Sequence, residues 1–167
     1  TVSFKLPVSI NASVDLNLIQ SRAANVVGLI QSGNRKYRNE YVVIGAHFDH
    51  IGMGGAGTGS RKPDTTGIHS GADDNASGTA GLLEIAQKLV SQKSRLKRSV
   101  LLLGFDAEEK GLLGAKYFTE NPLVDLQNIV AMINLDMIGR MKDSSITVGG
   151  VGTSPLFELL LNRESVG

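Results

Sequence analysis

The chain has 167 residues, with 17 Lys and Arg against 16 Asp and Glu, and it contains no Cys. This length is typical of a single domain, and the 41% of hydrophobic residues is ordinary for a globular protein. The net charge of +1 argues against a broad nucleic-acid surface, and without a run of about 18 apolar residues we expect no membrane span. Without Cys, any metal site must use carboxylates and the three histidines, His47, His50 and His69.

The first half of the chain is predicted to hold strands and one long loop. Residues 4–10 and 14–18 alternate between apolar and polar, and residues 24–30 form a third β-rich run. Residues 41–47 are nearly all apolar, which predicts a strand buried on both faces. The stretch 45–81 holds ten of the 20 glycines, and we interpret it as a long functional loop.

Helices and strands alternate in the second half. The predicted order is a helix over 75–91, a buried strand over 99–105, a short helix over 112–119, a buried strand over 129–135, a possible strand over 145–148 and a helix from 155 to about 162. Ser154 and Pro155 are typical of the start of that last helix. This alternation predicts an α/β fold, a three-layer sandwich with a mixed, centrally parallel β-sheet flanked by helices. The N-terminal strands predict an antiparallel edge.

Polar side chains with catalytic potential follow the predicted buried strands. His47 and Asp49 come after the first such strand, Glu108 and Glu109 after the second, and Asp136 after the third. Ligands of open α/β sheets bind at the carboxyl ends of the strands. We therefore expect these side chains to share one crevice.

Asp73 and Asp74 end the glycine-rich loop and add two carboxylates to the same edge. Closely packed carboxylates raise one another's pKa unless a cation neutralises them, and a divalent metal ion is the simplest such cation. Imidazole and carboxylate ligands without thiolate suit a hydrolytic zinc, manganese or cobalt site. Each feature alone also fits a surface loop, a helix cap or an acidic first turn. Their combination from four separate termini favours a metal site.

Four motifs resemble those of the M28 zinc peptidases, in particular the bacterial aminopeptidase-like group. They are YVVIGAHFDHIG, GADDNASGTAGLLEIA, LLLGFDAEEKGLLGA and MINLDMIGR, which occur in this order between about Ala24 and Arg140. Together they are far more specific than any one of them. The resemblance implies a zinc-exopeptidase fold and a metallopeptidase that removes N-terminal residues from peptides.

The resemblance also implies a role for each matching residue. His47 and Asp136 would ligate one metal ion, Glu109 would ligate a second, and Asp74 would bridge the two. The expected cofactors are thus two divalent ions, with zinc the first choice. Glu108 would be the general base that takes a proton from water.

Two further features follow from the same resemblance. Asp49 would orient the ring of His47 through its other nitrogen. The peptide bond between Asp74 and Asn75 would be cis.

The family pattern asks for one more histidine ligand beyond the last motif, and none follows His69. We therefore expect residues 1–167 to be one partial catalytic domain that is C-terminally incomplete, with an incomplete second metal site and little or no turnover. We interpret His50 and His69 as loop histidines near the site. The expected partners are peptide or protein substrates, with self-association through an exposed sheet edge, and relatives of this kind suggest a secreted or cell-envelope location.

Two other function classes compete with a peptidase. Residues 52–57, GMGGAG, match a dinucleotide-binding pattern, but they neither leave a strand directly nor open a helix, as phosphate binding there requires. A non-catalytic fragment or pseudo-enzyme with a structural or partner-binding role stays open, because one expected ligand is missing.

Overall fold

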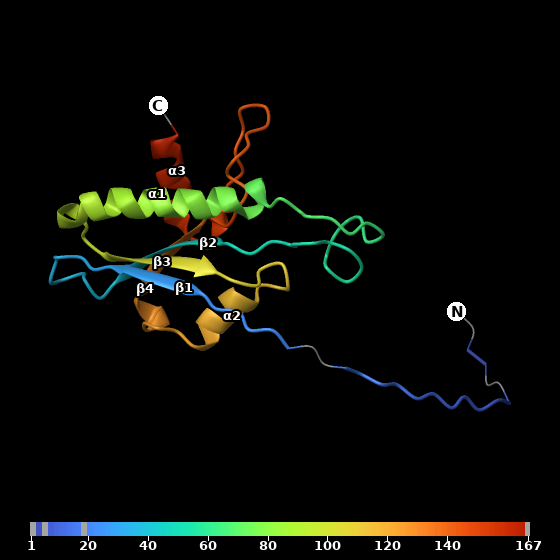
Figure 1. Ribbon diagram of the computed structural model, residues 1–167. Coiled ribbons are helices and arrows are strands. Elements are labelled where there is room, and N and C mark those ends of the chain that lie inside the picture. Colours follow the sequence, from blue (N-terminus) through green and yellow to red (C-terminus); the bar gives the residue numbers. More distant parts are fainter. Residues whose placement is uncertain (1–2, 5–6, 18–19, 166–167) are drawn as a thin grey trace.

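The computed structural model describes residues 3–4, 7–17 and 20–165 and shows one sheet with a helix on each face (Figure 1). The strands are β1 (Val26–Ile30), β2 (Tyr41–His47), β3 (Ser99–Phe105) and β4 (Ile129–Asn134). The helices are α1 (Gly78–Ser91), α2 (Leu113–Glu120) and α3 (Pro155–Glu164), with shorter helical turns η1 (Ala72–Ser77), η2 (Lys93–Arg95), η3 (Leu126–Asn128) and η4 (Val151–Thr153). Among the described residues, no helix is long and apolar enough to cross a membrane.

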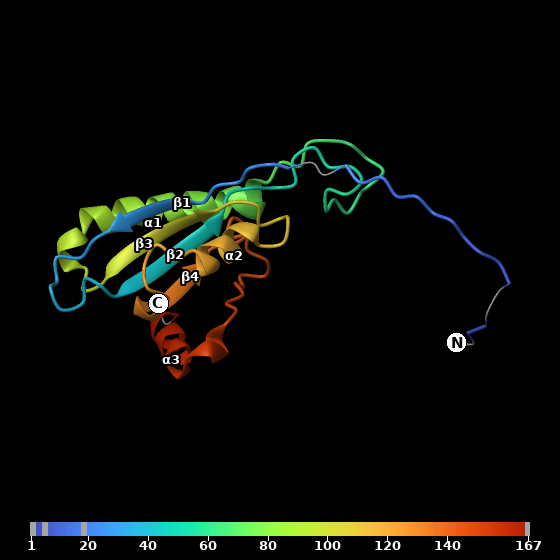
Figure 2. The same ribbon diagram turned by 90° about the horizontal axis from the view of Figure 1, so that it is seen from below.

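The sheet is mixed, with the strand order β1-β3-β2-β4 (Figure 2). Strand β2 runs parallel to both β3 and β4, whereas β1 is antiparallel to β3. Helix α1 connects β2 to β3 over one face, and α2 connects β3 to β4 over the other (Figure 1). The predicted three-layer α/β fold and its antiparallel edge are confirmed. The carboxyl ends of the three parallel strands meet at one edge.

Two apolar clusters hold the helices on the sheet. Ile44 and Leu82 belong to the cluster under α1, which Ile85 and Leu89 also contact. The cluster under α2 comprises Val43, Leu101, Leu103, Phe105 and Phe118. Neighbouring residues of a strand point to opposite faces, so the nearly continuous apolar runs of β2 and β3 supply both clusters.

The predicted N-terminal strands are partly wrong. Strand β1 is confirmed, but no described residue of 4–10 or 14–18 lies in a strand, and those described are exposed. Residues 5–6 and 18 of these runs lie outside the described residues. The segment 7–17 extends away from the sheet (Figure 1). Alternation alone does not make a strand, because a strand also needs a partner edge and a surface to cover its apolar face.

Three expectations for later segments need correction. The strand over 129–135 forms as β4, but it lies at the sheet edge with most side chains exposed rather than buried. Residues 145–148 form no strand, and only an isolated bridge joins Lys142 to Ser145. The glycine-rich loop spans 48–71, because Gly45 belongs to β2 and the last two glycines of the stretch belong to α1.

The predicted helices form close to their expected positions. Helix α1 begins at Gly78, after the turn η1, and α2 is shifted by one residue. Ser154 caps α3 as predicted, since its side chain accepts a hydrogen bond from the Leu156 N–H, and Pro155 opens the helix.

Candidate metal centre

Six residues predicted for the site gather at the carboxyl edge of the sheet. His47 is the last residue of β2, and Asp49 follows it in the loop. Glu108 and Glu109 come after β3, and Asp136 comes after β4. Asp74 reaches the same edge from η1, just before α1.

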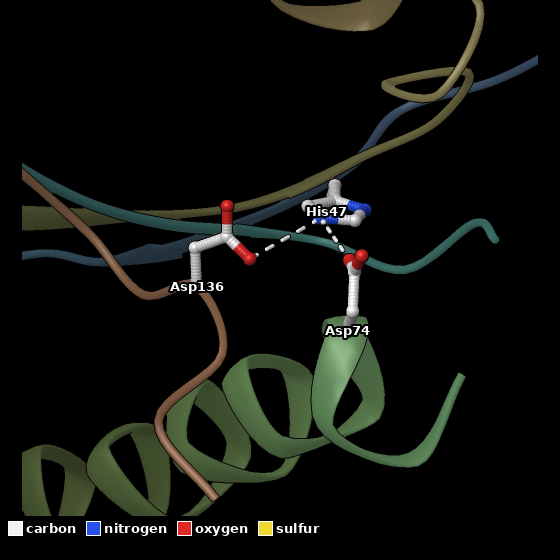
Figure 3. Close-up of side chains that lie close together, drawn as sticks. All are labelled: His47, Asp74 and Asp136. Atoms are coloured by element: carbon white, nitrogen blue, oxygen red, sulfur yellow. Dashed lines mark ion pairs between the residues drawn. The ribbon is translucent and has the colours of Figure 1, made fainter. Parts of the chain in front are cut away.

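Asp74, from η1, and Asp136, from the segment after β4, both face the ring of His47 (Figure 3). The Nε2 atom of His47 lies 3.3 Å from Asp74 Oδ1 and 3.6 Å from Asp136 Oδ1. Glu108 Oε2 lies 4.0 Å from the same nitrogen. The His47 side chain is 3% exposed, so the imidazole is fixed in the edge of the core while the carboxylates approach it from the open side.

The hydrogen bond of the other ring nitrogen, Nδ1, decides which nitrogen of His47 carries the proton. Nδ1 lies 3.1 Å from the backbone carbonyl oxygen of Asp49, which only accepts hydrogen bonds, so Nδ1 carries a proton. In the neutral ring, Nε2 then presents a lone pair to Asp74 and Asp136. Three acceptors that converge on one point fit a cation between them, and a ring held by a backbone carbonyl is typical of a metal-ligating histidine.

A second group of possible ligands shares Asp74. His50 Nδ1 lies 2.6 Å from Glu109 Oε1 and 4.0 Å from Asp74 Oδ2. The two oxygens of the Asp74 carboxylate therefore face two different histidines. The described residues contain two groups of side chains able to hold a metal ion, and Asp74 belongs to both.

Asp49 joins the ends of β2 and β3. Its Oδ1 accepts a hydrogen bond from the Glu108 N–H at 2.9 Å, and its Oδ2 accepts one from the Glu109 N–H at 3.2 Å. Its carboxylate lies 3.7 Å from His47 Nδ1, farther than its own carbonyl oxygen. The contact expected between this carboxylate and the His47 ring is thus made by the Asp49 backbone, and the carboxylate holds the two glutamates.

Asn75 joins α1 to the segment after β4. Its side chain is almost fully buried, and its Nδ2 donates to the Leu135 carbonyl at 2.9 Å. Its Oδ1 accepts from the N–H groups of Gly78 and Met137 at 3.0 and 3.2 Å. Asn75 adjoins Asp74 in the sequence, and the residues it binds flank Asp136. It therefore sets the distance between two carboxylates of the site. The predicted cis bond between Asp74 and Asn75 is present.

The site changes the proton affinity of Glu108. Burial raises the pKa of the Glu108 carboxyl, and nearby carboxylates raise it further, whereas the His47 imidazole lowers it. Glu108, His47 and Asp136 line a cavity of about 150 Å³, whose other walls include the apolar side chains Phe105, Leu112 and Met132. A carboxyl with a raised pKa beside a cavity is typical of an acid–base catalyst.

Asp73, unlike Asp74, forms an ion pair with an arginine. Its Oδ2 accepts a hydrogen bond from Arg140 Nε at 2.7 Å, and its Oδ1 accepts one from the Gly139 N–H at 2.9 Å. The Arg140 guanidinium lowers the pKa of the Asp73 carboxyl. This residue ties η1 to the segment after β4 and does not face the metal groups.

Two further residues lie at the centre's border. His50 is a loop histidine near the site, as expected, and it lies beside Glu109 and Asp74. The sequence analysis gives Asn75 no role, although an asparagine beside a predicted ligand is a common way to hold that ligand in place. His69 remains outside the two groups, with its Nε2 3.2 Å from Ser60 Oγ.

The chain is similar to known aminopeptidases and metalloproteases. Aminopeptidase NAALADL1 of Mus musculus is 33% identical over 165 residues, which cover 96% of this chain and 19% of that protein. A probable zinc metalloprotease of Pyrenophora tritici-repentis is 36% identical over 104 residues, 62% of this chain and 22% of that protein. The chain thus spans about a fifth of the length of these curated relatives.

A solved structure and a family model agree with these relatives. The leucine aminopeptidase precursor of Bacteroides thetaiotaomicron has a TM-score of 0.53 and 28% identity, with coverage of 70% of this chain and 42% of that one. The model of peptidase family M28 matches residues 25–164. The match covers most of the chain and every residue of both metal groups. This chain therefore belongs to peptidase family M28.

Proposed function

We propose that the protein is a zinc-dependent aminopeptidase that cleaves N-terminal residues from peptides with two divalent ions. The observation that carries the proposal is the position of Asp74, whose two oxygens face nitrogen atoms of two different histidines. A carboxylate so placed can bridge two metal ions. The aminopeptidase and zinc metalloprotease names of its relatives support the same reaction class.

The donor sets fit zinc. Each group combines one imidazole nitrogen with two carboxylate oxygens, and zinc in catalytic sites takes three such protein ligands. A bound zinc ion would lower the pKa of a water molecule and polarise the substrate carbonyl. His47, Asp74 and Asp136 would hold the first ion, and Glu109 with Asp74 would hold the second.

Glu108 would move the proton. It lies beside the first metal group, and its raised pKa favours a carboxylate that can both take and return a proton. It would accept the proton of the attacking water as the oxygen bonds to the peptide carbonyl carbon. It would then give that proton to the leaving amine as the C–N bond breaks.

The cavity next to Glu108 would bind a side chain of the peptide substrate. Glu108, His47 and Asp136 line its polar side, and Phe105, Leu112 and Met132 form part of its apolar wall. Such a wall would favour a small apolar side chain of the substrate, in keeping with the leucine aminopeptidase that is similar in structure.

A zinc-loaded assay with leucine p-nitroanilide tests the proposal. We expect weak but zinc-dependent hydrolysis, which E108Q reduces to the zinc-free background because the proton acceptor is lost. Glu84 is an exposed residue of α1, so E84Q is the matched control and should hydrolyse like the wild type. Equal loss in both variants, or zinc-independent hydrolysis, would contradict the proposal.

The assay also separates the alternative function. If the chain binds zinc but hydrolyses no peptide substrate, and a longer form of the protein that includes these residues is equally inactive, the non-catalytic, partner-binding role is favoured. The expected low turnover, the peptide partners and the secreted or cell-envelope location stay predictions. Fractionation of source cells would test the last.

A further inference from the structure

We propose that the end of the sheet opposite the candidate metal centre binds an anionic lipid surface. Two connections form this end, residues 31–40 between β1 and β2 and residues 92–98 between α1 and β3, and both lie at the left in Figure 1. We call the two connections together the basic end. This inference goes beyond the proposed function and uses no residue of the metal centre.

The charge of the chain is concentrated at the basic end. Its 17 residues hold seven of the 17 Lys and Arg residues but only one of the 16 Asp and Glu residues, Glu40. The rest of the chain has ten Lys and Arg against 15 Asp and Glu, so a nearly neutral total conceals a basic end on an acidic body. The seven cations are Arg35, Lys36, Arg38, Lys93, Arg95, Lys97 and Arg98.

Hydrogen bonds hold the two connections together as one surface. The hydroxyl of Ser32 donates to the Lys97 carbonyl at 3.0 Å, and the hydroxyl of Ser99 donates to the Arg38 carbonyl at 2.6 Å. Both serines are buried. The cations of the two connections therefore have fixed positions relative to one another, although about 60 residues separate them in the sequence.

Tyr37 and Glu40 engage a small part of this charge. The Nζ atom of Lys36 lies 4.9 Å from the centre of the Tyr37 ring, and the Cζ atom of Arg98 lies 5.2 Å from it. Arg98 Nε also donates to Glu40 Oε2 at 2.6 Å, so the one acid of the basic end is neutralised within it. The six other cations are all exposed to solvent. They supply the attraction for an anionic partner.

The form of the basic end favours a lipid surface over a nucleic acid. Single-stranded nucleic acids bind in a basic groove where their bases stack on aromatic side chains. Tyr37 is the one aromatic residue of the basic end, and its ring already holds Lys36 and Arg98. Exposed cations on the tips of two connections can instead all reach a flat anionic surface, and basic clusters of this size bind acidic lipids.

The direction of the strands also suits a lipid surface. Strands β2 and β3 run parallel, begin after the basic end and finish at the metal centre. A lipid surface bound at the basic end would therefore leave the metal centre facing the solution, where peptides would be reached.

Sedimentation with vesicles tests the proposal. We expect binding to vesicles of phosphatidylcholine mixed with phosphatidylserine, none to phosphatidylcholine alone, and weaker binding as salt rises, because salt screens these charges. Arg35 and Arg95 are exposed, one in each connection. R35E/R95E should lower the partition at least about 20-fold, because each cation near an anionic surface strengthens binding about 5-fold.

The matched control changes the charge equally at the other end of the sheet. Arg61 and Lys62 are exposed in the glycine-rich loop, and R61E/K62E should bind the vesicles like the wild type. Equal loss in both double variants would show an effect of net charge alone and overturn the proposal. Equal binding of the wild type to both kinds of vesicle would also overturn it.

A test on the wild type does not depend on the folding of any variant. In ¹H–¹⁵N amide spectra, phosphatidylserine vesicles should first weaken the signals of residues 31–40 and 92–98 and leave those of the glycine-rich loop. Weakening that begins at the glycine-rich loop would contradict the proposal. Binding to soluble poly-glutamate without binding to vesicles would assign the basic end to an acidic protein partner and overturn the lipid surface. Each of these results leaves the proposed zinc-dependent activity to its own assay.

Discussion

The carboxylate of Asp49 receives the backbone N–H of Glu108 at 2.9 Å, so a residue after β2 fixes the start of the segment after β3. Its other oxygen receives the N–H of Glu109. A proposed base and a proposed ligand are thus held by one side chain, while the carbonyl of the same residue holds His47. Asp49 acts by positioning and does not face the cavity.

Replacing Asp49 tests this positioning. In D49N the amide NH₂ would meet one of the two N–H donors, so one hydrogen bond is lost and a repulsive contact replaces it. We expect zinc affinity and kcat to fall about 10- to 100-fold, the usual range for groups that orient ligands. Titration with zinc and steady-state kinetics measure both. D64N, at an exposed loop position, should match the wild type, and an unchanged D49N would refute the positioning role.

Loss of the Asn75 side chain should destabilise the fold as well as the site. N75A leaves the Leu135 carbonyl and the N–H groups of Gly78 and Met137 without their partner. We expect unfolding free energy to fall by at least about 2 kcal/mol, because each buried unsatisfied group costs about 1–3 kcal/mol. Urea unfolding measures it. N39A, at an exposed position, should change stability by less than about 0.5 kcal/mol. Equal stability of the two variants would contradict the assignment.

The sequence predicted which side chains meet at one edge of the sheet where local pattern and strand topology agree. His47, Glu108 and Asp136 could be placed at one edge because each follows an apolar run that forms a parallel strand. The position of His50 beside Asp74 could not be predicted in the same way, because it depends on how the glycine-rich loop packs Gly71 against the His50 side chain. Loop paths of this length carry no periodic signal.

The errors in the predicted strands have a shared cause. Residues 14–18 and β4 have similar β-like sequences, but their burial depends on which segments cover them. Strand β4 has β2 as a neighbour and becomes an edge strand, whereas the described part of 14–18 has no strand partner. Composition predicts the tendency to form a strand, and only tertiary contacts decide its place.

The ion pair between Asp73 and Arg140 should make the stability of the fold depend on pH. Arg140 lowers the folded-state pKa of Asp73 below its ordinary value of 3.8. The pair therefore stabilises the fold above pH 3.8, and this contribution is lost as pH falls through the lowered pKa. In R140A the pKa of Asp73 should rise, so protonation begins at higher pH. A carboxyl ¹³C titration by NMR measures it, with K142A as the control. An Asp73 pKa unchanged in R140A would contradict the pairing.

The outer edge of β4 should make the protein self-associate. Among the described residues β4 pairs with β2 alone, and Val130, Met132 and Ile133 are exposed beside its free backbone groups. An unpaired apolar edge favours pairing with a second copy of the chain.

Size-exclusion chromatography measures this association. We expect the elution volume to decrease as the protein concentration rises. I133K should elute as a monomer at the same concentrations, because a charge on an edge strand opposes pairing. I68K makes the same change at an exposed loop position and should still associate. Monomeric wild-type protein throughout, or equal dissociation of both variants, would exclude β4 as the interface.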